Sequence, residues 1–168
     1  MNTLLKIAIA LCFTLVANAQ DFSKYESQEG VTSIKINKTM FKLMGKLNLD
    51  PEEKEAKEMI DMIKNLDGIQ ILTTRSESHK KSMLSDVKKH VSAKQLDELM
   101  IINDGGKTVE FYIKDKANSD LVEQLFMFIN DVDEAIVIMI NGSIDMSKIG
   151  GLMSEFNLPG ASELSKVN

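Results

Sequence analysis

The chain has 168 residues and an acidic balance, with 20 lysine and arginine residues against 25 aspartate and glutamate residues. This balance disfavours nucleic-acid binding, because affinity for nucleic acids comes largely from cationic contacts with phosphate groups. An aromatic content of 5%, without any tryptophan, also disfavours a surface that stacks on bases or sugars.

Residues 1–19 have the pattern of a secretory signal peptide. Lys6 supplies a positive charge, residues 7–17 form an apolar run, and Ala17-Asn18-Ala19 matches a cleavage site. We therefore expect cleavage after Ala19 and export to the periplasm or secretion. The apolar run is shorter than the ~20 residues that span a bilayer, and we expect no transmembrane segment in the mature chain.

Cys12 is the only cysteine and lies inside the predicted signal peptide. A lipoprotein signal has small residues just before the lipidated cysteine, whereas here bulky Leu11 precedes it. Lipidation of Cys12 is therefore the less favoured alternative. Without Cys12 the mature chain cannot form disulfides, thiolate metal sites or a cysteine nucleophile.

The remaining elements follow from hydrophobic periodicity and from turn and capping residues. In the first half of the chain we expect a flexible lead-in at 20–30, a strand at 31–36, a short helix at 40–47 and a longer helix at 51–63. A strand at 69–75 and a helix at 77–92 should follow. In the second half we expect strands at 98–102 and 108–113, a helix at 121–129, a strand at 135–140 and a final helix at 146–156. The sequence Asn103-Asp104-Gly105-Gly106 predicts a hairpin turn. The uninterrupted apolar run at 135–140 predicts a strand that is covered on both faces.

These elements predict an α+β protein. We expect one domain at 31–158 and a C-terminal tail at 159–168. The order β-α-β-β-α-β between residues 69 and 140 is that of a ferredoxin-like sandwich. The added parts are an N-terminal strand, a helical hairpin and a C-terminal helix. We expect strand 31–36 to pair beside strand 135–140, because that would cover the apolar edge.

Three glycines near the C-terminal end do not form a phosphate-binding motif. The sequence from Asn141 to Gly151 matches neither G-x-G-x-x-G nor G-x-x-x-x-G-K-[ST]. Asn141-Gly142 is predicted to be a turn. Gly150 and Gly151 fall inside a predicted helix, where two glycines are unfavourable by ~2 kcal/mol, so we expect a packing reason for them.

The sequence offers little for catalysis or metal binding. His79 and His90 lie on one predicted helix, ~16 Å apart along its axis, and cannot share a metal ion. We expect both to be partly exposed at the edge of the apolar face. No G-x-S-x-G or HExxH motif is present. We therefore expect no cofactor, and an enzyme remains an alternative whose site would assemble only in three dimensions.

The strongest local charge asymmetry lies between residues 75 and 94, which contain six basic residues and two acidic ones. Lys81 and Lys88 are predicted to form an outward stripe on the helix, with Lys89 at its flank and Arg75 before it. This face is the candidate site for an acidic envelope protein or an anionic lipid surface. A merely solvated helix face is the alternative interpretation.

Four stretches of the chain resemble the domain-of-unknown-function 4252 family of exported Gram-negative envelope proteins. They are VTSIKINKTMFKLM, IQILTT, LMIINDGGKTVEFYIKD and EAIVIMINGSIDMSKIGGL. The resemblance implies an exported α+β protein but transfers no activity, catalytic residue or cofactor. We therefore expect a non-catalytic binding or interaction module of the cell envelope, with a sensory or regulatory envelope component as a further alternative.

Overall fold

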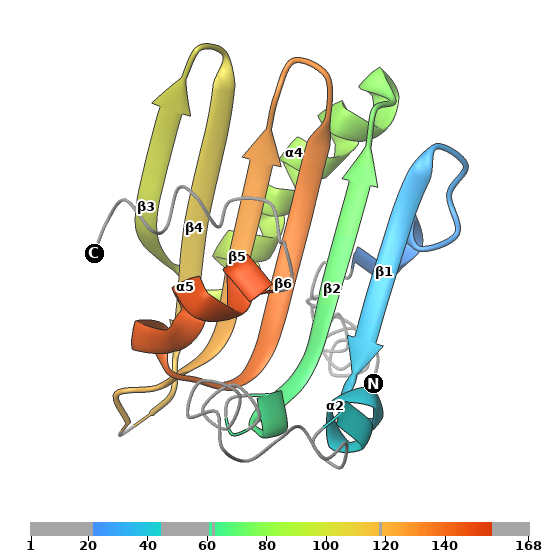
Figure 1. Ribbon diagram of the computed structural model, residues 1–168. Helices are drawn as coiled ribbons and strands as arrows, with labels where there is room; N and C mark the ends of the chain where they lie inside the picture. The colour runs from blue at the N-terminus through green and yellow to red at the C-terminus, as the bar shows by residue number, and fades with distance from the viewer. Residues whose placement is uncertain (1–21, 45–60, 62, 118, 156–168) are drawn as a thin grey trace, which may run out of the picture.

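Six strands form one antiparallel sheet in the computed structural model, which describes residues 22–44, 61, 63–117 and 119–155 (Figure 1). The strands are β1 (Val31–Asn37), β2 (Leu66–Thr74), β3 (Asp97–Asp104), β4 (Lys107–Asp115), β5 (Val122–Asn130) and β6 (Ala135–Ile144). They lie side by side in the order β1-β2-β6-β5-β4-β3. All neighbouring pairs run antiparallel. Together with the helices described next, this sheet confirms the predicted α+β class.

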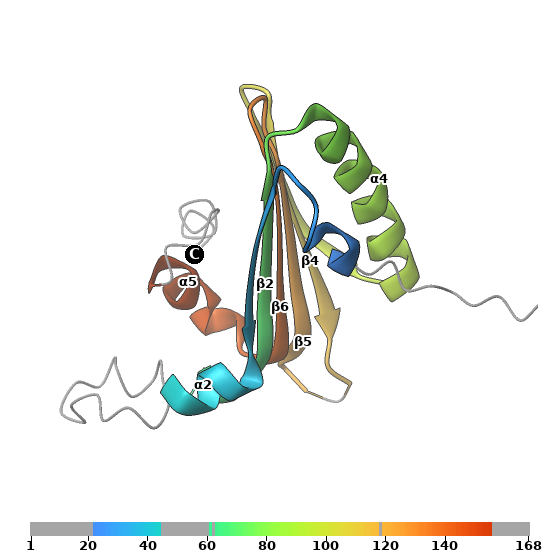
Figure 2. The same ribbon diagram turned by 90° about the vertical axis from the view of Figure 1, so that its right-hand side faces the viewer.

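Helices lie on both faces of this sheet. They are the 3-10 helix η1 (Phe22–Tyr25) and the α-helices α2 (Lys38–Met44), α4 (Glu77–Lys94) and α5 (Met146–Glu155). Figure 2 shows η1 and α4 on one face, and α2 and α5 on the other. The helix predicted at 51–63 lies mostly outside the described residues. None of the described helices is long and apolar enough to cross a membrane.

The sheet separates two hydrophobic clusters. The cluster on the α5 face includes Phe41, Ile69, Phe111, Leu125, Met127, Ile138, Ile140 and Ile149. The cluster on the α4 face includes Phe22, Tyr25, Leu72, Met83, Val87, Phe126, Phe128, Val137 and Met139. Successive residues of a strand point to opposite faces, so a strand that serves both clusters must be apolar throughout. This is the case for residues 125–129 of β5 and residues 135–140 of β6, in the middle of the sheet.

Several predicted elements are confirmed. The strands expected at 31–36, 69–75 and 135–140 correspond to β1, β2 and β6, and the helix expected at 77–92 corresponds to α4. The hairpin turn is also confirmed, since Asp104 pairs with Lys107 across Gly105 and Gly106. Both glycines have positive φ, which is the conformation that a two-residue type I′ turn requires.

The helix predicted at 121–129 is wrong, because this segment is strand β5. Its apolar run from Leu125 to Ile129 matches helical spacing, but a short continuous apolar run is equally compatible with a strand buried on both faces. Here Phe126 packs toward α4 and Met127 toward α5. The ferredoxin-like topology is therefore not confirmed, since its second helix is a strand and the sheet is larger than expected.

The predicted neighbour of the last strand is also wrong. β1 does not pair with β6 but with β2, and β2 lies between them. β6 is covered on its other side by β5. The expectation that 135–140 is covered on both faces is confirmed, because all six residues are buried. The two hydrophobic clusters cover the faces of this strand, and β2 and β5 cover its edges without β1.

The structure also corrects the interpretation of the glycines. Asn141 and Gly142 do not form a turn but lie within β6, beside a break in register between β6 and β2 at Leu66 and Gly68. Gly142 has a φ of +147° and lies close to the backbone of Asn65 and Leu66. Gly150, by contrast, has no heavy atom of the described residues within 4 Å of the place where a Cβ would stand, apart from its own helix backbone and chain neighbours. Close packing therefore does not explain Gly150.

The segment predicted as a flexible lead-in contributes to the core. Phe22 and Tyr25 on η1 are almost fully buried between α4 and the sheet. The His90 ring packs against Phe22 and Phe126, at centroid distances of 5.3 and 4.9 Å. His90 is therefore buried, not partly exposed as expected, whereas His79 is partly exposed. The short helix η1 supplies the aromatic surface that buries His90.

Candidate ligand-binding groove

The face of the sheet beneath α4 changes from apolar to polar near the end of that helix. One row across β6, β5 and β4 consists of Met139, Phe126 and Tyr112. The next row consists of Asn141, Gln124 and Lys114, with Gly68 of β2 beside Asn141. Gln124 donates a hydrogen bond from Nε2 to Oδ1 of Asn141, at 2.8 Å. The polar row is thus a fixed amide pair with a lysine at its end.

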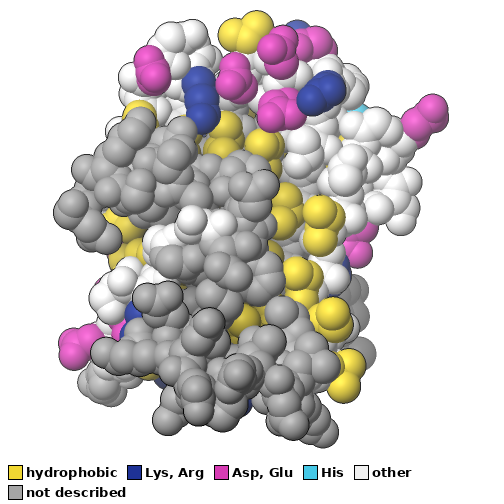
Figure 3. Space-filling view, viewed as in Figure 1, with side chains coloured by type: hydrophobic (Ala, Val, Ile, Leu, Met, Phe, Trp, Pro, Cys, Tyr) yellow, Lys and Arg dark blue, Asp and Glu magenta, His cyan; other side chains and the backbone are white. Residues whose placement is uncertain are grey.

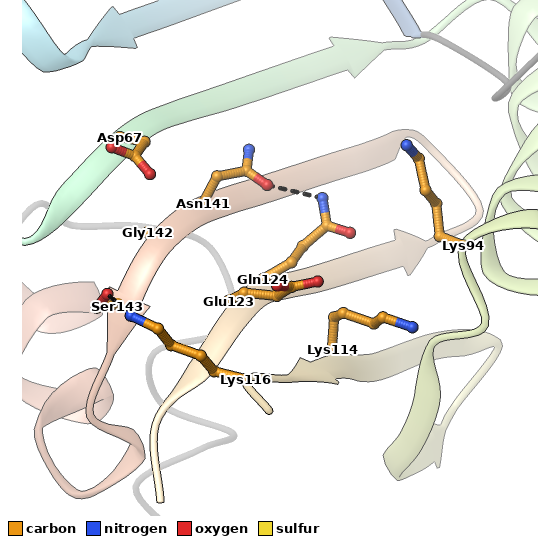
Figure 4. A pocket seen from close by; sticks show the side chains of 9 residues that line it. All are labelled: Asp67, Lys94, Lys114, Lys116, Glu123, Gln124, Asn141, Gly142 and Ser143. Carbon is orange, nitrogen blue, oxygen red and sulfur yellow. Dashed lines mark hydrogen bonds between the residues drawn. The ribbon is translucent and has the colours of Figure 1, made fainter. Parts of the chain in front are cut away.

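This polar row forms the floor of a groove of about 430 Å³. Its lining residues come from β2, α4, the β4–β5 region and β6, and they are Asp67, Lys94, Lys114, Lys116, Glu123, Gln124, Asn141, Gly142 and Ser143. In Figure 4 the amide pair lies in the middle of the groove. Lys94 and Lys114 lie at the end nearer α4, and Lys116 lies beside Ser143 at the other end.

Three lysines and two carboxylates line the groove. Lys116 donates to Oγ of Ser143 at 2.6 Å, which holds its ammonium group at the groove wall. The Asp67 carboxylate lies 2.5 Å from Nζ of Lys38, a residue outside the groove. The lining therefore has three positive charges against two negative ones, and one of the negative charges, that of Asp67, has a partner outside the groove. The groove can therefore attract an anionic group and orient it by hydrogen bonds.

The end of α4 determines where the groove begins. Gln95 follows the helix with a φ of +52°, and its N–H bonds to the carbonyl of Ser92. This left-handed residue ends the helix. Leu96 then turns into the core and is buried. Lys114 Nζ lies 3.4 Å from the Gln95 carbonyl, so the lysine of the polar row also contacts the end of the helix.

The predicted cationic residues lie elsewhere. Lys81, Lys88 and Lys89 are exposed on the outward face of α4, as expected, and none of them lines the groove. Nζ of Lys89 lies 3.7 Å from Oδ1 of Asp86. Arg75 precedes the helix and its Nε lies 3.6 Å from the Glu134 carboxylate. The structure therefore brings the three lysines onto one helix but places Arg75 in a separate ion pair.

Lys80, which contributed to the charge asymmetry of this segment, is not available on the surface. It is buried, and its Nζ donates to the Val132 carbonyl and to Glu77. Its charge therefore anchors α4 to the loop after β5 and does not add to the exposed basic face.

A second charged cluster lies beneath α4 and fixes η1. The buried Asp86 carboxylate accepts a hydrogen bond from the Tyr25 hydroxyl at 2.6 Å and lies 2.5 Å from Nζ of Lys24. Burial acts to raise the pKa of Asp86, but the hydrogen bonds from Lys24 and Tyr25 and the charges of Lys24 and Lys89 outweigh it and lower this pKa. Burial and the neighbouring carboxylate raise the pKa of Tyr25. This cluster is a structural anchor rather than part of the groove.

Sequence reasoning missed the groove because it depends on the register of β5. Gln124 and Asn141 are seventeen residues apart and meet only when 122–130 is a strand paired with β6. The available signal was the polar residue that borders each apolar run. Lys114 and Asn141 follow their runs, and Gln124 precedes its run. The predicted helix at 121–129 concealed their common row.

The comparisons with known proteins identify the family and nothing more specific. No curated protein matches the chain. No solved structure matches it either. The family model described as Domain of unknown function (DUF4252) matches residues 25–152, from the end of η1 into α5. Because this match covers most of the chain, the protein belongs to the DUF4252 family.

Proposed function

We propose that this protein is a non-catalytic binding module of the cell envelope, and that the groove at the C-terminal end of α4 binds a ligand carrying a carboxylate or phosphate group. The observation that supports this proposal is the groove lining, in which Lys94, Lys114 and Lys116 surround a hydrogen-bonded amide pair. Ammonium groups supply the charge for an anion, and the amides supply directed hydrogen bonds.

Binding is favoured over catalysis by the types of side chain in the groove. Its lining contains no histidine, the side chain whose unperturbed pKa is best suited to proton transfer near neutral pH. The feature that favours an enzyme is the presence of two carboxylates, Asp67 and Glu123, on the same lining. Asp67 already has Lys38 as an ion-pair partner, which weakens that alternative.

The basic face of α4 is the competing site for the same function. Lys81 and Lys88 are exposed and suit an acidic protein or an anionic lipid surface. The groove is preferred because it also offers hydrogen-bonding groups in a fixed arrangement. A flat row of lysines offers charge alone, and its attraction is screened by salt.

Amide NMR of the chain from Gln20 onward, titrated with inorganic phosphate and separately with succinate, tests this proposal. Sodium chloride at matched ionic strength is the control for screening. We expect shifts at Gln124, Asn141 and Ser143 that saturate with phosphate or succinate. These shifts should disappear in the Lys114→Gln/Lys116→Gln variant and persist in the matched control, Lys81→Gln/Lys88→Gln.

Three results would argue against the groove. Shifts on α4 that disappear with Lys81→Gln/Lys88→Gln would move the site to the basic helix face. Equal shifts with sodium chloride would show only charge screening. Turnover of a phosphate or carboxylate ester that is lost in Glu123→Gln would favour the enzyme alternative.

We also propose that the protein is exported and processed after Ala19. The support is the sequence of residues 1–19, with its charged start, apolar run and Ala-x-Ala ending. Intact-mass measurement of protein recovered from the cell envelope should give a chain that begins at Gln20. A lipid-modified chain beginning at Cys12 would refute this processing.

A further inference from the structure

We infer that two copies of this chain associate through strand β1. Among the described strands, β1 and β3 are the two edges of the sheet. An edge strand has one row of backbone N–H and C=O groups without partners in its own sheet, and proteins commonly protect such edges with bulges or charges. The two edges differ in this respect, and the difference indicates which one pairs.

Strand β3 carries both kinds of protection. Its pairing with β4 is interrupted by a register shift between Glu98 and Met100. Acidic residues stand at its ends, including Asp97, Glu98 and Asp104. If β3 paired with its own copy around Ile101, Glu98 of each copy would face Asp104 of the other. Like charges directly opposite each other are destabilising.

Strand β1 has less of this protection, because it has no register shift and only one charged residue. It pairs with β2 along all seven residues without a register shift. Its single charged residue is Lys35, whose Nζ lies 2.8 Å from the Glu26 carboxylate. Antiparallel pairing of two β1 strands around Ile34 would place Ile34 opposite Ile34 and Lys35 opposite Ser33. No like charges would face each other in this register.

The side chains at this edge are apolar and exposed. Ile34, in the middle of β1, is 48% exposed although its neighbours in the same row, Ile71 and Ile138, belong to the core on the α5 face. Met40 and Leu43 on the adjoining helix α2 are 50% and 55% exposed. Figure 3 shows apolar side chains running down the β1–β2 side of this face. The apolar surface therefore continues to the edge and ends there.

A second copy fits this surface better than an unrelated partner. Twofold pairing continues the row Ile138–Ile71–Ile34 into the same row of the other sheet, so each half-exposed Ile34 covers the other. Because the strands run antiparallel, α2 of each copy would lie beside the beginning of β1 in the other copy. Met40 and Leu43 of each copy would then be buried as well, which favours association through the hydrophobic effect.

Cysteine crosslinking tests this register directly. The chain from Gln20 onward contains no cysteine, so Ile34→Cys introduces one thiol per copy. Residues opposite each other across paired strands have Cβ atoms about 4.5–5.5 Å apart, close to the distance that a disulfide requires. Mild oxidation should therefore give a disulfide-linked dimer. Ile101→Cys, at the centre of β3 and similarly exposed, is the matched control and should stay monomeric.

The mass in solution tests the association without oxidation. Light scattering should give twice the mass of one chain for the unmodified protein and the mass of a single chain for Ile34→Lys. Ile101→Lys should leave the doubled mass unchanged. A single-chain mass for the unmodified protein over a wide concentration range would overturn the inference, as would crosslinking of Ile101→Cys at the same rate as Ile34→Cys. An unchanged circular dichroism spectrum of Ile34→Lys confirms that it folds.

Discussion

Replacing Gly142 with alanine should strongly destabilise the fold. Gly142 lies within β6 with a φ of +147°, which L-residues rarely adopt. An added Cβ would lie 2.5 Å from the Asn65 carbonyl oxygen and 2.7 Å from Cα of Leu66. Both are backbone atoms, so neither can rotate away as the end of a flexible side chain can. The strands β2 and β6 would have to separate locally to accept the methyl group.

The loss of stability expected for Gly142→Ala has two contributions. An unfavourable backbone conformation costs about 1–3 kcal/mol, and an overpacked methyl group costs about 1–3 kcal/mol more. Their sum, about 2–6 kcal/mol, is a large fraction of the total stability of a typical domain. At about 2–4 °C per kcal/mol for a chain of this size, the melting temperature should fall by about 4 °C or more.

Gly150→Ala is the matched control. Gly150 lies within α5, and outside the backbone of that helix and its chain neighbours no described atom lies within 4 Å of the position that an added Cβ would take. Alanine is favoured over glycine in a helix by about 0.5–1 kcal/mol, so this variant should be slightly more stable. Urea unfolding followed by circular dichroism measures both variants. Equal stability of Gly142→Ala and the unmodified protein would refute the close-approach argument, and a destabilised Gly150→Ala would show that α5 needs glycine for another reason.

Two further predictions concern the packing of η1 against α4 and the sheet. Phe22→Ala should lower the free energy of unfolding by about 3–5 kcal/mol, because Phe22 is fully buried beneath α4. A change below about 1 kcal/mol, measured by urea unfolding, would refute its place in the core. Asp86→Asn should lower stability at pH 7 by about 1–3 kcal/mol, because it removes charged hydrogen bonds with Lys24 and Tyr25. The pKa of Asp86 is lower in the folded protein than the unfolded value of about 3.9, so the ionised carboxylate stabilises the fold above that pH. This stabilisation is lost as the pH falls through the folded pKa. The free energies of unfolding in urea of the variant and the unmodified protein should therefore converge in acid. A difference that persists unchanged at low pH would contradict this assignment.

The sequence was sufficient to predict most elements but not how they combine. The alternation in 31–36 and the turn glycines after Asp104 are local signals, and both correspond to the structure. The segment 121–129 has no such local signal, because its continuous apolar run suits a buried helix and a buried strand equally. Only the pairing of this segment with β4 and β6 decides between them, and this pairing cannot be read from the segment itself.

Because the sequence does not show how strands pair, the basic face of α4 was predicted and the groove was not. Lys81 and Lys88 lie on one helix, where seven residues bring side chains to the same face, so the pattern is visible in the sequence. The groove instead requires the registers of β2, β6, β5 and β4 together. Burial of Lys80 was equally invisible, because its partner is the carbonyl of Val132, in the loop after β5.

The position of the groove follows from the lengths of the elements around it. The 18 residues of α4 extend ~27 Å, whereas the 10 residues of β6 extend ~33 Å, so the helix cannot cover the whole strand. An apolar row at the uncovered end would expose a hydrophobic patch, and polar residues avoid this. Solubility alone, however, does not require an amide pair bonded to each other beneath three lysines. The proposed binding site would account for that arrangement, and the phosphate and succinate titrations separate the two explanations.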